Sequence, residues 1–129
     1  MSSPHYVVGP TFTDNGTTLT ASGSVAGLGN EDVTCLLTAT GTATVIGVNP
    51  AGNVAPGQTQ TVNVSGTQTI TDVKNGRVNF SVTTIEPTVT NAGLPNKKWT
   101  AVATDVDFTA ATLNVQQGGQ TVLSTSVSL

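Results

Sequence analysis

Apolar and hydroxyl side chains alternate at every second position through most of this chain, and this alternation constrains its fold more than any other feature. In LTASGSV (residues 19–25) and VTCLLTA (residues 33–39), small or apolar side chains occupy the odd positions and mostly Thr or Ser the even ones. No window places apolar residues at i, i+3, i+4 and i+7. Because successive side chains of a strand point to opposite faces, the pattern predicts half-buried strands and an all-β chain.

One face of each alternating segment is expected to line the core. The residues assigned to that face are Leu19, Ala21, Gly23, Val25, Val33, Cys35, Leu37, Ala39, Val78, Phe80 and Val82. From Trp99 to Thr104 both faces are apolar or nearly so, which is typical of a strand in the middle of a sheet. We expect Trp99 between two sheets, with a surface tryptophan that stacks on a sugar or peptide as the alternative.

Turn signals recur at intervals of about ten residues, as in chains of many short strands. Asn75-Gly76 predicts a type I′ hairpin, since both central residues of that turn need positive φ. Residues 117–120, QGGQ, predict a second hairpin, and residues 49–58 and 86–96 are longer connections. The spacing predicts one domain over residues 1–129, a single antiparallel β-sandwich of immunoglobulin-like or Greek-key type with about eight or nine strands.

Charged residues make up only 9% of the chain, against roughly 25% in an average domain. Hydroxyl groups are plentiful instead, since 34 residues are Ser or Thr, and such surfaces are typical of secreted and cell-surface β-proteins. A net charge of −3 with four basic residues argues against a nucleic-acid partner, because phosphate binding relies on clustered Lys and Arg. No apolar run approaches the length of a membrane span, so we expect no membrane insertion.

The N-terminal sequence MSSP has neither the basic start nor the apolar segment of a signal peptide. If the native protein is exported, we expect this chain to be the mature form with an added initiator Met. Its single cysteine, Cys35, excludes an intramolecular disulfide.

Residues able to support catalysis are few, and we expect no enzyme, no catalytic residue and no cofactor. His5 is the only histidine, near the N-terminus, where we expect a surface ring rather than a catalytic base. Cys35 lies among apolar neighbours with no Lys or Arg nearby in sequence, and reactive thiols need an electropositive setting. We therefore expect a buried, inert thiol.

Asp105 and Asp107 are the candidate metal ligands, because they share one face of a strand roughly 7 Å apart. A pair of this kind could hold Ca²⁺ with loop carbonyls, or act as a glycosidase pair. With only seven acidic residues in the chain, an acidic strand end facing water is the interpretation that we favour, with no metal.

Three segments together resemble a group of small, secreted bacterial proteins, found especially among actinobacteria and without an assigned function. They are GSVAGLGNEDVT…LTATGTATV from Gly23, NPAGNVAPGQ (49–58) and AGLPNKKWTA (92–101), and VDFTAATLNVQQGGQTVL follows the same pattern. The resemblance implies a cysteine pair at positions held here by Gly47 and Leu94. This departure suggests that the cross-link has been lost or was removed by engineering.

The resemblance also implies that positions 47 and 94 are adjacent, so that the two long connections meet at one end of the sandwich. These connections would then form one rim, whose candidate binding residues are Asn49, Asn53, Asn96, Lys97 and Lys98. Because Pro and Gly shape the path and Asn side chains bond to nearby backbone, we expect a structured corner first and a binding rim second.

Three functions follow as hypotheses. We favour a non-enzymatic, secreted or cell-surface module that binds a protein or glycan or has a structural role, or a stable scaffold obtained by engineering. The first alternative is an extracellular filament subunit joined by β-strand addition, with HYVV or TVLSTSVSL as donor; a monomer is preferred to a polymer. The second is a calcium-dependent carbohydrate binder or hydrolase that uses Asp105 and Asp107.

Overall fold

The computed structural model describes residues 3–91, 94–96 and 98–129, and within them every regular element is a β-strand. The strands are β1 (His5–Asp14), β2 (Leu19–Ala26), β3 (Val33–Val48), β4 (Val54–Pro56), β5 (Gln60–Ile70), β6 (Val78–Thr83), β7 (Thr100–Gln117) and β8 (Gln120–Ser128). All their pairings are antiparallel. The all-β prediction is confirmed, and the number of strands agrees with the expected range.

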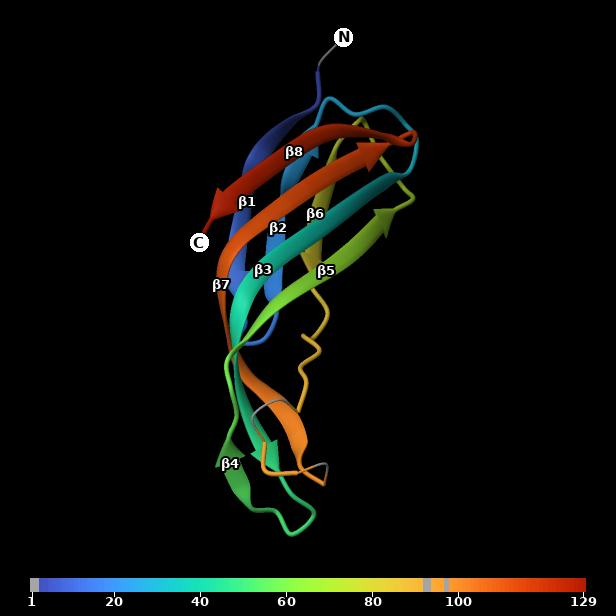
Figure 1. The fold of residues 1–129 in the computed structure, drawn as a ribbon. Helices are drawn as coiled ribbons and strands as arrows, with labels where there is room; N and C mark the ends of the chain where they lie inside the picture. The colour runs from blue at the N-terminus through green and yellow to red at the C-terminus, as the bar shows by residue number, and fades with distance from the viewer. Residues whose placement is uncertain (1–2, 92–93, 97) are drawn as a thin grey trace.

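The strands form two sheets, one behind the other (Figure 1). The smaller sheet has the order β1-β2-β6. In the larger sheet β3 pairs with β7 on one side and with both β5 and β4 on the other, and β8 pairs with the far side of β7. Among the described strands, β8 pairs only with Ala110–Gln117 of β7, so the segment 99–104, for which a central strand was predicted, pairs with β3 alone, and that prediction is wrong.

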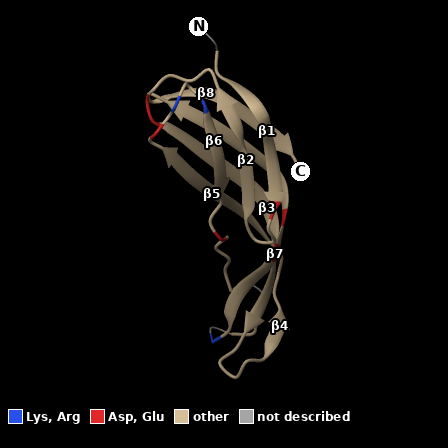
Figure 2. Cartoon of the chain, turned by 180° about the vertical axis from the view of Figure 1, so that it is seen from behind, with Lys and Arg blue, Asp and Glu red and all other residues tan. Residues whose placement is uncertain are grey.

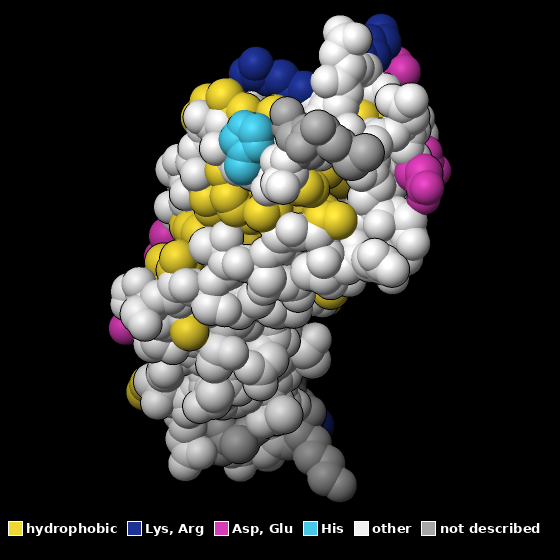
Figure 3. Space-filling view, turned by 90° about the horizontal axis from the view of Figure 1, so that it is seen from above, with side chains coloured by type: hydrophobic (Ala, Val, Ile, Leu, Met, Phe, Trp, Pro, Cys, Tyr) yellow, Lys and Arg dark blue, Asp and Glu magenta, His cyan; other side chains and the backbone are white. Residues whose placement is uncertain are grey.

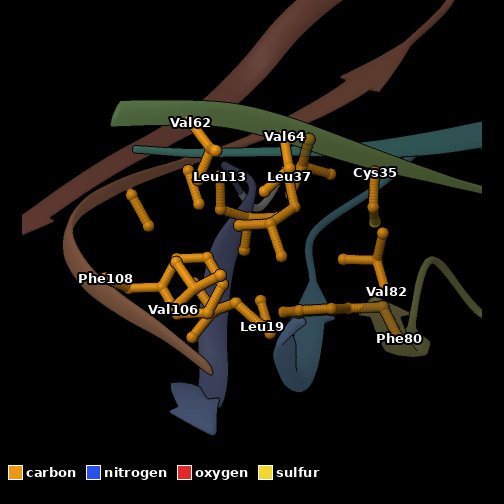
Figure 4. Close-up of a cluster of buried hydrophobic side chains, with 14 of the residues drawn as sticks. Leu19, Cys35, Leu37, Val62, Val64, Phe80, Val82, Val106, Phe108 and Leu113 are labelled. Carbon is orange, nitrogen blue, oxygen red and sulfur yellow. The ribbon is translucent and has the colours of Figure 1, made fainter. Parts of the chain in front are cut away.

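One hydrophobic core contains side chains from both sheets (Figure 4). The inward-facing residues predicted from the alternation are buried except Gly23, which is partly exposed, and Leu19, Val33 and Leu37 are at most 1% exposed. Val106 and Phe108 of β7, in the larger sheet, are buried in the same core. Burial of such aliphatic and aromatic side chains removes apolar surface from water, which is the main favourable contribution to folding.

Trp99 does not lie between the sheets, and this prediction is wrong. Its side chain is partly exposed just before β7, outside the core cluster. Phe80 on β6 and Phe108 on β7 are the buried aromatic side chains instead. The position of the tryptophan differs because β7 continues past the edge of the smaller sheet, so that its first residues have no second sheet to face.

The Asn75-Gly76 turn forms with the predicted backbone, since both residues have positive φ, 57° and 68°. It closes only an isolated bridge between Lys74 and Arg77, and the strands on either side belong to different sheets. This connection is therefore a corner between sheets, and the hairpin prediction is wrong in that respect. The second predicted hairpin is confirmed, because β7 and β8 pair directly across Gly118 and Gly119.

At one end of the molecule β3 and β7 extend beyond the smaller sheet and pair with β4, forming a projection at the bottom of Figure 1. We call this projection the arm. It consists of Val45–Val48 of β3, β4, Thr100–Ala103 of β7 and the described parts of connections 49–53 and 88–99. The arm brings together all the rim residues that the structure describes.

We predict that Leu37→Ala lowers the free energy of unfolding by about 2–5 kcal/mol, because it leaves a cavity in a fully buried site. Urea denaturation followed by circular dichroism measures the change. The same substitution at Leu129, which is 52% exposed, serves as the control and should change stability by less than about 0.5 kcal/mol. Equal losses in the two variants would contradict the assignment of the core.

Candidate functional site

Gly47 and Leu94 are in contact in the arm, as the resemblance implied. The Leu94 side chain fills the space that a Cβ atom on Gly47 would need. Gly47 faces the same side of β3 as the core residues, so Leu94 caps the inner face of the arm. The two long connections therefore meet at one end of the molecule.

Asn49 organises the first of these connections. Its side-chain Oδ1 accepts hydrogen bonds from the backbone amides of Ala51 and Asn53, at 3.0 and 2.8 Å. The Asn49 amide in turn donates to the Asn53 carbonyl, and Gly52 has a φ of 83° within this turn. The Asn49 side chain is thus used to shape the corner, while the Asn53 side chain is exposed.

Asn96 has the same role in the second connection. Its Oδ1 accepts a hydrogen bond from the Lys98 amide at 2.9 Å, and its carbonyl accepts one from the Trp99 amide. Lys98 is exposed. The candidate Lys97 lies outside the described residues. As expected, Asn49 and Asn96 bond to the nearby backbone, and Asn53, Asn96 and Lys98 are the described rim residues that are exposed.

Two amide side chains that the sequence did not single out fasten the second connection to the larger sheet. Gln60 donates to the Thr90 carbonyl at 2.8 Å and accepts from the Thr90 amide at 2.9 Å. Asn91 Oδ1 accepts from the Ala101 amide at 3.1 Å. An amide that donates and accepts in this way mimics a backbone partner, but no local sequence signal reveals where in the fold that partner lies.

The outer face of the arm carries a group of neighbouring apolar side chains. The pairings Ile46↔Pro56, Ile46↔Val102 and Val48↔Val54 place them side by side on one face. We call this group the arm patch; its members are Ile46, Val48, Val54, Pro56 and Val102. Val54 is 62% exposed and Val102 is 40% exposed.

The arm patch contrasts with the rest of the same sheet face. Along β3 the outward positions are occupied by Thr38, Thr40, Thr42 and Thr44 before they change to Ile46 and Val48. This change is visible in the sequence TATGTATVIGV, but the sequence analysis did not assign a face to Ile46 and Val48. Contiguous apolar side chains on a surface mark interaction sites more often than scattered ones do.

Figure 2 shows charged side chains of both signs at the end of the molecule opposite the arm. The acidic side chains lie at the opposite end and at the junction between the sheets and the arm, while the one charge drawn at the tip of the arm is cationic. In sequence, residues 88–104 contain Lys97 and Lys98 and no Asp or Glu, although the chain as a whole has a net charge of −3. The arm is therefore a cationic end on an acidic protein.

Asp105 and Asp107 lie on β7 at the junction with the arm, exposed and on one face, as predicted. Their partners on the neighbouring strand are Thr44 and Thr42. Within the described part of the chain no group of three or more His, Cys, Asp or Glu side chains gathers around them or elsewhere. The pair thus has hydroxyl neighbours and no third carboxylate among those residues.

Cys35 and His5 occupy the environments that we expected. The Cys35 thiol is fully buried, and burial raises its pKa to about 11 from an ordinary value of 9.0, so that the nucleophilic thiolate is disfavoured. His5 is exposed, and its Nδ1 lies 2.8 Å from the Ser3 carbonyl, to which it donates. Cys35 is buried in the core whereas His5 is exposed at the surface, and the fold does not present them as a catalytic pair.

A hollow of about 630 Å³ lies at the end of the molecule opposite the arm, between His5, Leu28 and Asn75. Figure 3 looks onto this end and shows hydrophobic side chains beside the histidine, with cationic and acidic side chains at the margin. Glycines of the 26–30 and 75–76 turns supply much of its wall. Sequence reasoning identified these turns but not the hollow between them, which forms only when the turns of two strand connections meet.

Comparison of the chain with models of protein families, with curated proteins and with solved structures finds no match. Among the described residues no helix has the length and hydropathy needed to cross a membrane.

We predict that the double substitution Gly47→Cys with Leu94→Cys forms a disulfide, because the two positions are in contact. Closing a loop of this length should raise the free energy of unfolding by about 2–4 kcal/mol, through restriction of the unfolded chain. Thiol titration and urea denaturation, with and without reductant, measure the two effects. Each single variant is a control that should not cross-link internally, and a double variant that stays reduced under mild oxidation would contradict the contact.

We predict that Ca²⁺ and EDTA each leave the melting temperature of the wild type unchanged, because the neighbouring Thr42 and Thr44 are poor ligands for this ion. The melting temperature of Asp107→Asn should be equally insensitive to Ca²⁺ and EDTA. Differential scanning fluorimetry with and without about 5 mM Ca²⁺ measures the shift in melting temperature. This concentration is high enough to occupy sites as weak as those of extracellular calcium-binding modules. A calcium-dependent increase that Asp107→Asn abolishes would establish the metal site instead.

Proposed function

We propose that this protein is a non-enzymatic, secreted or cell-surface module that binds a partner protein through its arm. The observation that carries the proposal is the arm patch, where Val54, Val102 and their apolar neighbours face solvent on an otherwise hydroxyl-rich sheet. Burying these side chains against a partner would gain roughly 25 cal/mol for each Å² of apolar surface removed from water.

The chemistry of the arm patch favours a protein over a glycan. Its members are aliphatic, and flat aromatic rings, which stack on sugars, are absent from it. In the adjacent rim, the Oδ1 atoms of Asn49 and Asn96 accept hydrogen bonds from backbone amides and so fix the shape of the border. An aliphatic surface with a rigid border suits a partner protein with an apolar patch of its own.

The charge of the arm indicates which residues should surround the apolar patch of the partner. Lys98 is exposed beside the first residues of β7, and residues 88–104 contain no acidic side chain. Acidic side chains around the partner's apolar patch would meet this cationic end, while the acidic remainder of the chain would disfavour other orientations. We therefore expect the partner to be a protein with an aliphatic patch bordered by Asp and Glu.

An extracellular location and an immunoglobulin-like, Greek-key arrangement belong to the same proposal. They are supported by the hydroxyl-rich, charge-poor composition, by the two facing antiparallel sheets and by the resemblance to small secreted actinobacterial proteins. A binding role at loops and edges of a rigid scaffold is the usual use of such domains.

The alternative of strand addition is favoured by one observation, the unpaired outer edge of β8. The two terminal segments themselves, within β1 and β8, are already paired in the sheets, with β2 and β7. Strand addition in this protein would therefore use an edge as an acceptor rather than a free terminal strand as a donor.

We predict that Val54→Asp weakens binding to an interacting protein at least about tenfold, because it places a charge within the apolar contact, at a side chain that is 62% exposed in the free protein. The probes are an immobilised panel of bacterial extracellular proteins and, separately, a glycan array, read by biolayer interferometry and fluorescence. Wild-type binding should also weaken as salt concentration rises, through screening of the cationic border.

The matched control is Thr67→Asp, which adds the same charge at an exposed outward position on β5 of the same sheet. Protein binding that is lost in Val54→Asp and kept in Thr67→Asp supports the arm as the site. Binding that both variants retain or both lose, or binding to glycans alone, would contradict the proposal.

A further inference from the structure

Among the described strands, β1 and β6 border the smaller sheet and β4, β5 and β8 border the larger one, and each of these edges except that of β8 is obstructed. On β1 the register shifts twice, between Tyr6 and Val8 and between Val8 and Thr11, and Pro10 has no amide hydrogen to donate. Irregularities of this kind prevent an added strand from pairing continuously.

Hydrogen bonds between neighbouring segments occupy backbone groups on the edges of both β5 and β6. The Ser65 carbonyl on β5 accepts a hydrogen bond from the Ile85 amide at 2.9 Å, so the chain after β6 runs along this edge. The Ser81 amide on β6 is bonded by the Gln68 side chain at 2.9 Å. Next to β5, the edge strand β4 has only three residues and ends in Pro56.

The outer edge of β8 has none of these obstructions over residues 123–128. The segment LSTSVS contains no charge, no Pro and no Gly, and its pairing with β7 has no register shift from Leu123 to Ser128. Within the part of the chain that the structure describes, no backbone hydrogen bond reaches this edge. Natural sheets seldom leave an uncharged, regular edge open.

The free backbone groups of this edge belong to three serines. The Leu129 amide donates to the Thr109 carbonyl, which places Leu129, Val127, Thr125 and Leu123 in the hydrogen-bonded pairs with β7. The amides and carbonyls of Ser124, Ser126 and Ser128 therefore point away from β7, to the open side. Their side chains lie on the hydroxyl-rich outer face, where Ser126 Oγ is 3.1 Å from Thr112 Oγ1.

From this arrangement we propose that β8 pairs antiparallel with β8 of a second copy, forming a dimer with a continuous sheet. A two-fold axis at Ser126 pairs Ser124 with Ser128 of the second copy and Ser126 with its own counterpart. This register makes about six new backbone hydrogen bonds. It brings no charges together, because the neighbouring outward residues of β7 are Thr112, Asn114 and Ala110.

A second observation points to the same side of the molecule. Tyr6 on β1 lies beside β8, since Thr125 Oγ1 donates to its hydroxyl oxygen at 3.1 Å, and Val7 and Val8 follow it at 44% and 56% exposure. A strand added beyond β8 would approach these valines and cover apolar surface together with the half-buried Leu123 and Val127. Each copy has one such edge, so association stops at two copies and does not continue to a polymer.

The proposal is tested by light scattering after size exclusion across a range of protein concentrations, on the full chain. We expect the wild type to show a dimer, twice the 13.0 kDa chain mass, whose share grows with concentration. Ser126→Lys should be monomeric, because two lysines meet at the axis, and Ser126→Pro should be monomeric, because it removes an outward amide that β7 does not use. Ser126→Ala should dimerise like the wild type.

Thr67→Lys is the charge-matched control, since it adds the same charge to the same sheet face on β5. It should dimerise normally. A wild type that stays monomeric at all concentrations, or a dimer that survives both Ser126→Lys and Ser126→Pro, would overturn the proposal. These substitutions leave the arm unchanged, so failure here and failure of arm binding are separate results.

Discussion

The antiparallel pairing of β3 with β7 is the interaction on which the rest of this structure depends. It runs from Val33↔Gln117 at one end to Val48↔Thr100 at the other. In its first part the inner face carries side chains such as Leu37 and Leu113, which meet the smaller sheet and complete the core. In its last part the same two strands continue without the smaller sheet and create the arm.

This one ladder explains why the two faces of the larger sheet differ along their length. Where the smaller sheet covers the inner face, alternation keeps Thr, Ser and Asn on the outer face. Beyond the end of the smaller sheet, the connection between β6 and β7 lies against the inner face of β3, where Leu94 covers Gly47. Because Gly47 has no side chain, the connection that contains Leu94 can approach β3 closely on its inner face. On the outer face of the same part of β3 lie Ile46 and Val48.

The two proposed interaction surfaces use different physical properties of the same sheet. The arm patch offers apolar surface with a cationic border, and its specificity would come from matching shape and charge. The edge of β8 offers backbone groups in a regular row and carries almost no side-chain specificity, so symmetry and register decide what can bind there. The arm patch lies at the end of the β3–β7 ladder near Val48 and Thr100, and β8 pairs with the other end of β7, so occupation of one surface leaves the other accessible.

The sequence by itself determined the strands and which side of most of them is buried, because period-two alternation is a local property of the extended chain. Val33, Cys35 and Leu37, and likewise Val78, Phe80 and Val82, follow from it directly. It also indicated the Asn75-Gly76 turn, whose backbone angles are local, and the corner built around Asn49. Only the tertiary structure decided that this turn joins two sheets, that Trp99 lies outside the core, and that Ile46 and Val48 face water. These outcomes depend on where the strands of the smaller sheet end relative to β3 and β7. The alternation within β3 or β7 is a local property and does not show how far the smaller sheet extends along them.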